Sequence, residues 1–569
     1  MNETSHAPLK RLMLYHHFDR DNVIDPHVLY QLKAFHDFGI RIVFLTNSDL
    51  AQDELKKLDG LAEETILHGN HGFDFGAWQD WFRANEKTAA EPFDQLILMN
   101  CSCYGPLFPL DDLFAGMERK PCDFWGLTSY KTDEKYPEHV QSNFSCFLPQ
   151  TFLSDVFWDY WKKDHDFSTF PKTIENGEVE LSRTLTNAGF KSAAFCEIDN
   201  RQTSWQLSFV QSFNFYAPDY LIRRYRVPFL KIKGFLSSET LPFGKAGLIM
   251  NAIRDSGSSY PPHLIFDHLR RVQPLSWQKD LPKTLLVSRQ DTPTVLKSSK
   301  MKIAAVIHVS SAALFEEQHE FLRNIPESCA FFFSVPNDAD IEPIRKKMDG
   351  YNVKSIVAEP EDNHFSSWLK CFRNESNDYD LVLKLHTLNA GNVPELLPFE
   401  LRNYLFSMLS GSKPQIGNII EAFDSEPDLG ILFPPIPPVL MMRNPHVFTQ
   451  KHSDENLKIL NACCNGHLPP AETGNPVFPA GGMFWYRSSA LKSLIDNPYA
   501  PPTDLERILP YIAQANGYYY RLVISEDMLA RSFQIFEDRL TSIYWNENDI
   551  QIERLNSKIH SLEQSFSWK

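Results

Sequence analysis

The chain has no uninterrupted apolar run of about 18 residues, the length that crosses a lipid bilayer. Its first residues also lack the basic start and long apolar core of a secretory leader. Membrane spans and secretion are therefore not expected, and we expect a cytoplasmic protein. Peripheral contact with the inner face of the plasma membrane stays open, because a short basic stretch lies at residues 223–233.

Positive charge is in deficit, with 56 Lys and Arg against 72 Asp and Glu and a formal net charge of −16. Proteins whose main partner is a nucleic acid carry a surplus of Lys and Arg that neutralises phosphates. The charge balance therefore excludes nucleic acid as the main partner. With 43% hydrophobic and 22% charged residues, the composition is that of an ordinary globular protein.

Cysteine is sparse and follows no recognisable pattern. The nine cysteines are an odd number set among apolar neighbours, which fits reduced thiols better than a disulfide framework. Cys101, Cys103, Cys122 and Cys146 lack the spacing of a zinc site. The glycine-rich residues 479–483 lack the spacing of a P-loop, so no nucleoside triphosphate site is expected there.

What the sequence does contain is a glycine-bracketed loop followed by a buried strand. Gly72 and Gly76 lie close together, and glycine permits close approach of the backbone to a ligand. The apolar residues 96–99 predict a strand with Asn100 and Ser102 at its carboxyl end. Open α/β sheets bind nucleotides at that end of their strands. The pattern therefore predicts a nucleotide-sugar site.

This pattern occurs twice along the chain. Residues 75–83 and 365–373 share two Phe, one Trp and one Arg at the same spacing. Each copy is followed by an aromatic residue, an Asp and an apolar strand, and each is preceded by two further strands, of which residues 11–17 and 302–308 are the first. One internal duplication explains these matches, and its period is far too long for a solenoid. We therefore expect two related α/β domains.

A chain of 569 residues exceeds what one hydrophobic core usually supports. The expected divisions are an α/β domain over residues 1–214, a small helical connector over 215–300, a second α/β domain over 301–545 and a helical tail over 546–569. Apolar residues of the tail recur at helical spacing. This short seam predicts either docking onto its own domain or a homodimer.

Several segments together resemble the rhamnan synthesis protein F family, bacterial glycosyltransferases that build rhamnose-containing surface polysaccharides. The matching segments cover nearly the whole chain and are residues 70–76, 100–107, 123–128, 139–144, 178–182, 226–231 and 478–485. The resemblance implies two GT-A-like, Rossmann-type domains. It also implies transfer of L-rhamnose from dTDP-β-L-rhamnose, with inversion, onto a lipid-linked glycan or a growing surface polysaccharide.

Two positions depart from the family pattern at strand ends. Cys101 stands where the family has an aspartate, and Leu388 follows Thr387 where the family has a lysine. The first departure removes an acid that would bind a divalent cation. Mg²⁺ or Mn²⁺ is therefore disfavoured as a cofactor, and we expect Arg, Lys, His and backbone N–H groups to meet the diphosphate charge.

Sugar transfer needs groups that stabilise the leaving nucleoside diphosphate and a base that deprotonates the acceptor hydroxyl. Glu178 is predicted to begin an amphipathic helix, where its ionised form is favoured, although helix capping alone would explain a Glu there. The resemblance of residues 178–182 to the family makes Glu178 the first candidate base and Glu180 the second. The candidate catalytic residues are Glu178, Glu180, His386 and Asp504. The candidate sugar-nucleotide residues are Asn47, Asn70, Gly72, Asp74, Asn100, Ser102, His139, Gln141 and Arg183.

Two other functions stay open on the sequence alone. The first is a non-catalytic glycan-binding or assembly protein whose sites have decayed at Cys101 and Leu388. The second is a transferase that uses another sugar nucleotide. The second α/β domain, with His386, is either a second transferase site or a degenerate copy that binds the acceptor.

Overall fold

The structure is a computed structural model that describes residues 9–130, 136–197, 217–236, 245–280, 284–289, 300–359, 363–387, 396–436, 453–464 and 477–545. The chain divides into two compact units. The first consists of residues 1–272 with 280–282, and the second of residues 273–279 with 283–569. The expected tail over 546–569, with its homodimer seam, lies outside the described residues, as does Leu388.

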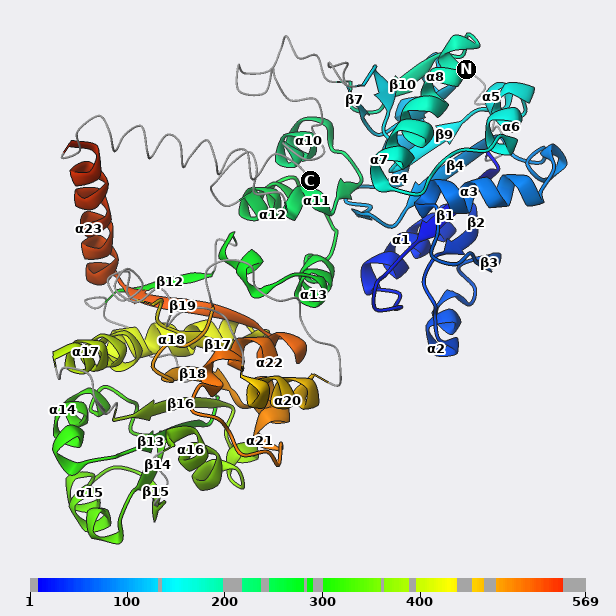
Figure 1. The fold of residues 1–569 in the computed structure, drawn as a ribbon. Helices are drawn as coiled ribbons and strands as arrows, with labels where there is room; N and C mark the ends of the chain where they lie inside the picture. Colours follow the sequence, from blue (N-terminus) through cyan, green and yellow to red (C-terminus); the bar gives the residue numbers. More distant parts are fainter. Residues whose placement is uncertain are drawn as a thin grey trace, which may run out of the picture. The chain divides into compact units, whose positions relative to one another are not determined.

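The first unit is built on a mixed seven-stranded sheet (Figure 1). In sheet order its strands are β10 (Ser192–Ala194), β6 (Phe124–Gly126), β9 (Phe144–Phe147), β4 (Gln95–Asn100), β1 (Arg11–His17), β2 (Ile40–Thr46) and β3 (Glu64–Leu67). β4, β1, β2 and β3 pair in parallel, whereas β9 is antiparallel to both β4 and β6. Two short sheets pair β5 (Cys103–Tyr104) with β11 (Leu230–Lys231), and β7 (Ser129–Tyr130) with β8 (His139–Val140).

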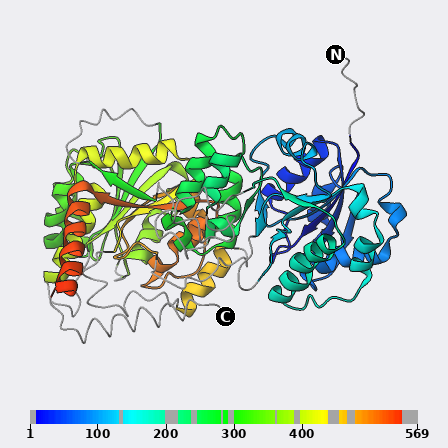
Figure 2. The same cartoon turned by 90° about the horizontal axis from the view of Figure 1, so that it is seen from above.

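Helices cover both faces of this sheet, as Figure 2 shows. They are α1 (Pro26–Asp37), α2 (Gln52–Leu55), α3 (Phe73–Ala84), α4 (Leu110–Glu118), α5 (Pro149–Phe152), α6 (Asp155–Lys162), α7 (Phe170–Thr173) and α8 (Glu180–Asn187). Alternate strand residues point to opposite faces. Leu12 and Leu14 pack in the core with α3, α6 and α8, and Met13 and Tyr15 in the core with α1 and α4. Burial on both faces explains why the strands are continuous apolar runs.

The described residues of the expected connector before residue 273 are mostly helical and belong to the first unit. Its helices are α10 (Pro218–Tyr225), α11 (Lys233–Leu236), α12 (Lys245–Asp255) and α13 (His263–Val272). β11 precedes α11 and pairs with β5, and α13 packs against α1. This segment therefore reaches the carboxyl ends of the central strands.

The second unit repeats the sheet of the first. In sheet order its strands are β12 (Leu285–Ser288), β19 (Tyr519–Ser525), β17 (Leu429–Phe433), β18 (Phe484–Arg487), β16 (Leu381–His386), β13 (Ile303–His308), β14 (Ala330–Val335) and β15 (Val353–Ala358). From β15 to β19 this order matches that from β3 to β10, and β18 is antiparallel where β9 is. Apart from the added β12, the two sheets correspond strand for strand, as a duplication requires.

Helices of the second unit also lie on both faces of its sheet. They are α14 (Ala312–Leu322), α15 (Ile341–Lys347), α16 (His364–Phe372), α17 (Leu396–Ser410), α18 (Lys413–Ser425), α20 (Asp454–Cys463), α21 (Lys492–Ile495), α22 (Leu509–Ala515) and α23 (Glu526–Trp545). Trp368 of α16 is as fully buried as Trp78 of α3, so both repeat tryptophans belong to the core. Across the described ranges, no helix has the length and apolar character needed to cross a bilayer.

Candidate functional site

Polar side chains gather at the carboxyl edge of the first sheet, where β1, β2 and β4 end. His16 pairs in register with Asn100, and Asn47 follows directly after β2. The amide of Asn100 donates to Asp74 Oδ2 at 2.8 Å, and its oxygen accepts from the backbone N–H of Ser102 at 3.2 Å. The predicted residues Asn47, Asp74, Asn100 and Ser102 are thus brought to the edge where such sheets bind nucleotides.

The loop before α3 places Asp74 at this edge. Gly72 has φ +67°, and a Cβ on it would lie 2.8 Å from the Cα of Gly76, so this position requires glycine. Asn47 Nδ2 donates to the carbonyl oxygens of His71 at 3.4 Å and Phe73 at 3.3 Å, which fixes the loop to β2. Asn70 is exposed in the same loop.

His16 is a member of this edge that the sequence did not single out. Its ring is buried, and among the described residues its Nε2 atom has no hydrogen-bond partner. Burial lowers the pKa of His16, while the charge of Asp74 acts in the opposite direction. His16 is therefore a neutral, buried side chain near Asp74 that lies beneath this edge.

Cys101, which replaces the acid of the family pattern, is poorly suited to bind a metal ion. The backbone N–H of Phe18 donates to its sulfur at 3.4 Å, and burial raises the pKa of the thiol to about 12. A protonated thiol is a poor metal ligand. Of the nine residues predicted to bind the sugar nucleotide, only Asp74 has a carboxylate. Mg²⁺ and Mn²⁺ prefer several oxygen ligands, so these nine residues are poorly suited to hold either ion.

Glu178 lies in a buried hydrogen-bonded group with His139 and Ser142. His139 Nε2 is 3.1 Å from Glu178 Oε1, and Oε2 accepts from Ser142 N at 2.7 Å and Ser142 Oγ at 2.6 Å. Burial acts to raise the pKa of Glu178, but the hydrogen bond from His139, the charges of Lys231 and His139 and the bond from Ser142 lower it to about 2. The carboxylate is therefore ionised at neutral pH.

This environment favours a positioning role for Glu178 over proton abstraction. A carboxylate with so low a pKa is a weak base at neutral pH. The cavity beside it has a volume of about 10 Å³, room for about one water molecule. The prediction that Glu178 begins a helix is wrong, because it lies in a π-helical turn over Ile174–Val179 that continues from α7 into α8. A Cβ on Gly177 would lie 2.7 Å from the ring of Phe75. Glu178 thus holds His139 and Ser142 in place.

Three other predicted residues of the first domain lie apart from the edge. Gln141 is buried and accepts a hydrogen bond from Thr128 Oγ1 at 2.7 Å. Arg183 forms an ion pair with Glu180, one turn earlier on α8, and its side chain is 59% exposed. The structure does not bring Glu180 or Arg183 into contact with Asp74.

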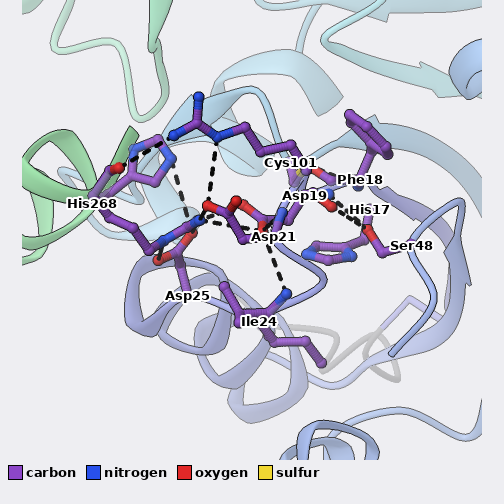
Figure 3. A network of polar contacts seen from close by, with 12 residues as sticks. His17, Phe18, Asp19, Asp21, Ile24, Asp25, Ser48, Cys101 and His268 are labelled. Atoms are coloured by element: carbon purple, nitrogen blue, oxygen red, sulfur yellow. Dashed lines mark hydrogen bonds and ion pairs between the residues drawn. The ribbon is translucent and has the colours of Figure 1, made fainter. Parts of the chain in front are cut away.

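A network of ion pairs fixes the loop after β1 beside this edge (Figure 3). Arg271 of α13 forms ion pairs with Asp19, with Asp21 at 2.5 Å and with Asp25 at 2.6 Å. Tyr104 OH lies 2.6 Å from Nδ1 of His268 on the same helix. Figure 3 shows the dashed contacts that join the three aspartates to this network. Helix α13 is thereby tied to the loop on which this edge depends.

The corresponding edge of the second sheet carries a different set of side chains. His308 pairs in register with His386, whose ring stacks on His364 at 3.7 Å between centroids. The amine of Lys384 is buried and lies 2.6 Å from His364 Nδ1 and 2.8 Å from the carbonyl oxygen of Gly482. Burial holds the pKa of Lys384 well below its usual range, and His386 Nε2 has no hydrogen-bond partner within the described part of the chain.

The duplication shows what changed between the two edges. Strand register and the repeated Phe equate His16, Asn100 and Asp74 with His308, His386 and His364, and Leu98 with Lys384. His308 therefore corresponds to His16 and not to His17, so the match of residues 11–17 with 302–308 that the sequence suggests is wrong by one residue. The second edge has lost the carboxylate and gained two histidines and an amine.

Asp504, the other candidate in the second domain, lies apart from His386. Its carboxylate accepts from Ser453 Oγ at 3.3 Å, at the start of α20. The neighbouring Glu506 is half-buried, with its Oε2 atom buried, and this burial raises its pKa to about 7. Among the described residues Oε2 has no hydrogen-bond partner, and Glu506 is the acid that interacts electrostatically with Lys384. Glu506 is therefore the carboxyl group associated with the second edge.

Replacing Lys384 by Leu, its counterpart in the first domain, should raise the free energy of unfolding by about 1 kcal/mol at pH 7. The folded state disfavours the ammonium form, so the unfolded state binds more protons below the ordinary pKa of 10.5. The gain should shrink as the pH rises toward that value. Urea denaturation at pH 7 and pH 10 measures it, with the exposed Lys492→Leu as control. A loss of stability that is equal at both pH values would contradict this interpretation.

The chain matches one protein family and is distantly similar to one further protein and to several solved structures. Residues 42–518 match the model of a family described as rhamnan synthesis protein F, which confirms the resemblance. An uncharacterized protein, y4gN of Sinorhizobium fredii, is 26% identical over 162 residues, 28% of this chain. The match spans 42% of that relative.

Two solved structures illustrate the distant likenesses. The glycosyltransferase GlyE of Streptococcus pneumoniae has 12% identity and a TM-score of 0.26, over 71% of this chain and 91% of that one. The mannosyltransferase PcManGT of Pyrobaculum calidifontis, solved with GDP-Man and Mn²⁺, has 8% identity and a TM-score of 0.22, over 48% of this chain and 78% of that one. Both TM-scores are low, so the fold rests on the strand order described above.

Proposed function

Since the chain belongs to the rhamnan synthesis protein F family, we propose that it is a glycosyltransferase acting on a surface polysaccharide. The donor is dTDP-β-L-rhamnose, and the acceptor is a lipid-linked or growing glycan. The observation that carries this proposal is the gathering of Asn47, Asp74, Asn100 and Ser102 at the carboxyl edge of the first sheet. Such an edge suits the ribose and diphosphate of a sugar nucleotide.

Transfer with inversion is a single displacement. The acceptor oxygen bonds to the anomeric carbon, the bond from that carbon to the diphosphate oxygen breaks, and dTDP leaves with the electron pair. The hydroxyl proton passes to a base. We assign Asp74 to a hydroxyl of the nucleotide, because its carboxylate is half-buried in the loop held by Asn47.

Negative charge on the leaving dTDP requires positive groups nearby. His139 is 3.1 Å from the ionised Glu178, and Lys231 interacts electrostatically with the same carboxylate. Lys231 lies on β11, paired with Cys103 one residue after Ser102. These two residues are our candidates for the diphosphate, whereas the predicted Arg183 is paired with Glu180 on α8.

The second domain is proposed to bind the acceptor rather than a second donor. Its edge exchanges Asp74 for His364 and Leu98 for Lys384, so it has lost the carboxylate assigned to the nucleotide hydroxyl. Because burial keeps its amine and imidazoles neutral, this edge suits hydrogen bonding to the hydroxyl groups of a glycan rather than binding of a second diphosphate.

The test is a transfer assay with a donor panel of dTDP-rhamnose, UDP-glucose and GDP-mannose. We expect transfer from dTDP-rhamnose alone and a loss of about 100-fold in Asp74→Asn. Asp111→Asn is the matched control, because Asp111 also lies in the first helical turn, of α4, and is exposed. Transfer from another donor would point to a different transferase, and nucleotide or glycan binding without transfer or hydrolysis would point to a non-catalytic protein.

A further inference from the structure

Two histidines and one aspartate converge beside the loop that leads to α3. His68 follows β3, His71 lies in the loop, and Asp80 lies on α3. Asp80 Oδ2 is 2.9 Å from His68 Nε2 and 3.6 Å from His71 Nε2. We propose that these three side chains bind a divalent transition-metal ion such as Zn²⁺, independently of the glycosyl transfer proposed above.

The hydrogen bonding of His68 supports a cation at its Nε2 atom. Its Nδ1 atom lies 3.0 Å from Asn47 Oδ1 and 3.1 Å from the carbonyl oxygen of Gly69. Asn47 Nδ2 is turned toward two other carbonyl oxygens, so the amide oxygen is the atom that faces His68. Both ring nitrogens of His68 therefore face oxygen acceptors, whereas a neutral imidazole has one N–H. With the N–H at Nδ1, either a second proton or a metal ion must lie between Nε2 and Asp80. His71 Nε2 faces the same carboxylate oxygen, and this second imidazole favours the metal ion.

The arrangement also has the outer contacts of a metal site. Histidines that bind metals usually donate their other N–H to a carbonyl or carboxylate, as Nδ1 of His68 does here. Ligand atoms around tetrahedral zinc lie about 3.3 Å apart, given Zn–N bonds of about 2.0 Å. The distances of 2.9 and 3.6 Å bracket that value, and all three ligand atoms lie within 4.8 Å of one another.

Access and selectivity follow from burial and ligand type. The side chain of His68 is 5% exposed, whereas those of His71 and Asp80 are 67% and 49% exposed. An ion can therefore enter from solvent and keep an open coordination position. Two imidazoles and one carboxylate suit Zn²⁺, Co²⁺ or Ni²⁺ better than Mg²⁺, which prefers oxygen ligands.

A second cluster, Asp25, His27 and His268, is less suited to a metal. Its ligand atoms also lie within 4.8 Å of one another. However, Asp25 already forms an ion pair with Arg271 at 2.6 Å, so a positive charge is present without a metal. The cluster with His68 is the one that lacks such a cation among its contacts in the part of the chain that the structure describes.

The experiment is titration of the purified, chelator-treated full chain with Co²⁺, followed by visible absorption and native mass spectrometry. We expect one Co²⁺ per chain, with d–d bands and no thiolate charge-transfer band. His71→Ala and Asp80→Asn should each weaken binding by about 100-fold. His36→Ala is the control, since His36 is exposed and lies 3.5 Å from Asp37, with no further ligand assigned to that pair.

Three results would overturn the site. Absence of Co²⁺ and Zn²⁺ binding to the wild type would mean that His68 and Asp80 form a simple ion pair. Binding that survives in both variants would place the metal elsewhere. Loss in only one variant would contradict the three-ligand set. Because each variant is compared by metal binding and not by transfer, failure of this site leaves the proposed transferase untouched.

Discussion

Replacing Glu178 by Gln is expected to lower the free energy of unfolding by about 3 kcal/mol at pH 7. The carboxylate has a pKa of about 2 against an ordinary value of 4.5, so folding favours its ionised form. That contribution is fully present above the ordinary value and is lost as the pH falls from about 4.5 toward about 2. The difference between wild type and variant should therefore vanish at the acid end of this window.

Urea denaturation of both proteins between pH 7 and pH 2 measures this effect. Glu180→Gln is the matched control, because Glu180 follows two residues later and forms an ion pair with the exposed Arg183. The control should change the free energy of unfolding by less than about 1 kcal/mol. An equal effect of the two substitutions, or an effect of Glu178→Gln that persists unchanged to pH 2, would contradict the described hydrogen bonding.

Arg271→Met should destabilise the first unit by about 3 kcal/mol. The substitution leaves Asp19, Asp21 and Asp25 facing one another without the guanidinium that pairs with all three. Burial acts to raise the pKa of Asp19, but its bonds with Arg271 and the backbone N–H groups of Asp21 and Val23 lower it below 3.8. The stabilisation is thus present above that value and is lost as the pH falls below it.

Thermal and urea unfolding of Arg271→Met would measure the loss, with Arg254→Met as control. Arg254 forms an ion pair with Asp255 and its side chain is 71% exposed, so its removal should cost less than about 1 kcal/mol. Similar stability of the two variants at pH 7 would show that α13 is not held by this network.

The sequence predicts the central strands well, because strands that are buried on both faces consist mainly of consecutive apolar residues. β1, β4, β13 and β16 are buried on both faces, and each is an apolar run in the sequence. Their carboxyl ends follow from parallel pairing, so Asn100 and His386 could be placed at the two edges before any coordinates.

Contacts between distant segments are what the sequence does not show. Arg271 reaches Asp19 from 252 residues away, and Ser142 reaches Glu178 from 36 residues away. No local pattern encodes these pairs, so the sequence could place Glu178 only by its expected helix position and by the family resemblance of residues 178–182. His364, in contrast, could have been predicted from the sequence. It directly precedes Phe365, as Asp74 directly precedes Phe75, although the aromatic residues are the more visible part of the repeat.

The proposed function depends above all on binding of a sugar nucleotide at the carboxyl edge of the first sheet. Calorimetric titration of the protein with dTDP, UDP and GDP, with and without Mg²⁺, measures this binding. We expect binding of dTDP in preference to the others without added Mg²⁺, and an affinity at least about tenfold weaker in Asp74→Asn but unchanged in Asp111→Asn. Absence of binding to all three nucleotides, or equal dTDP affinity in wild type and Asp74→Asn, would contradict it.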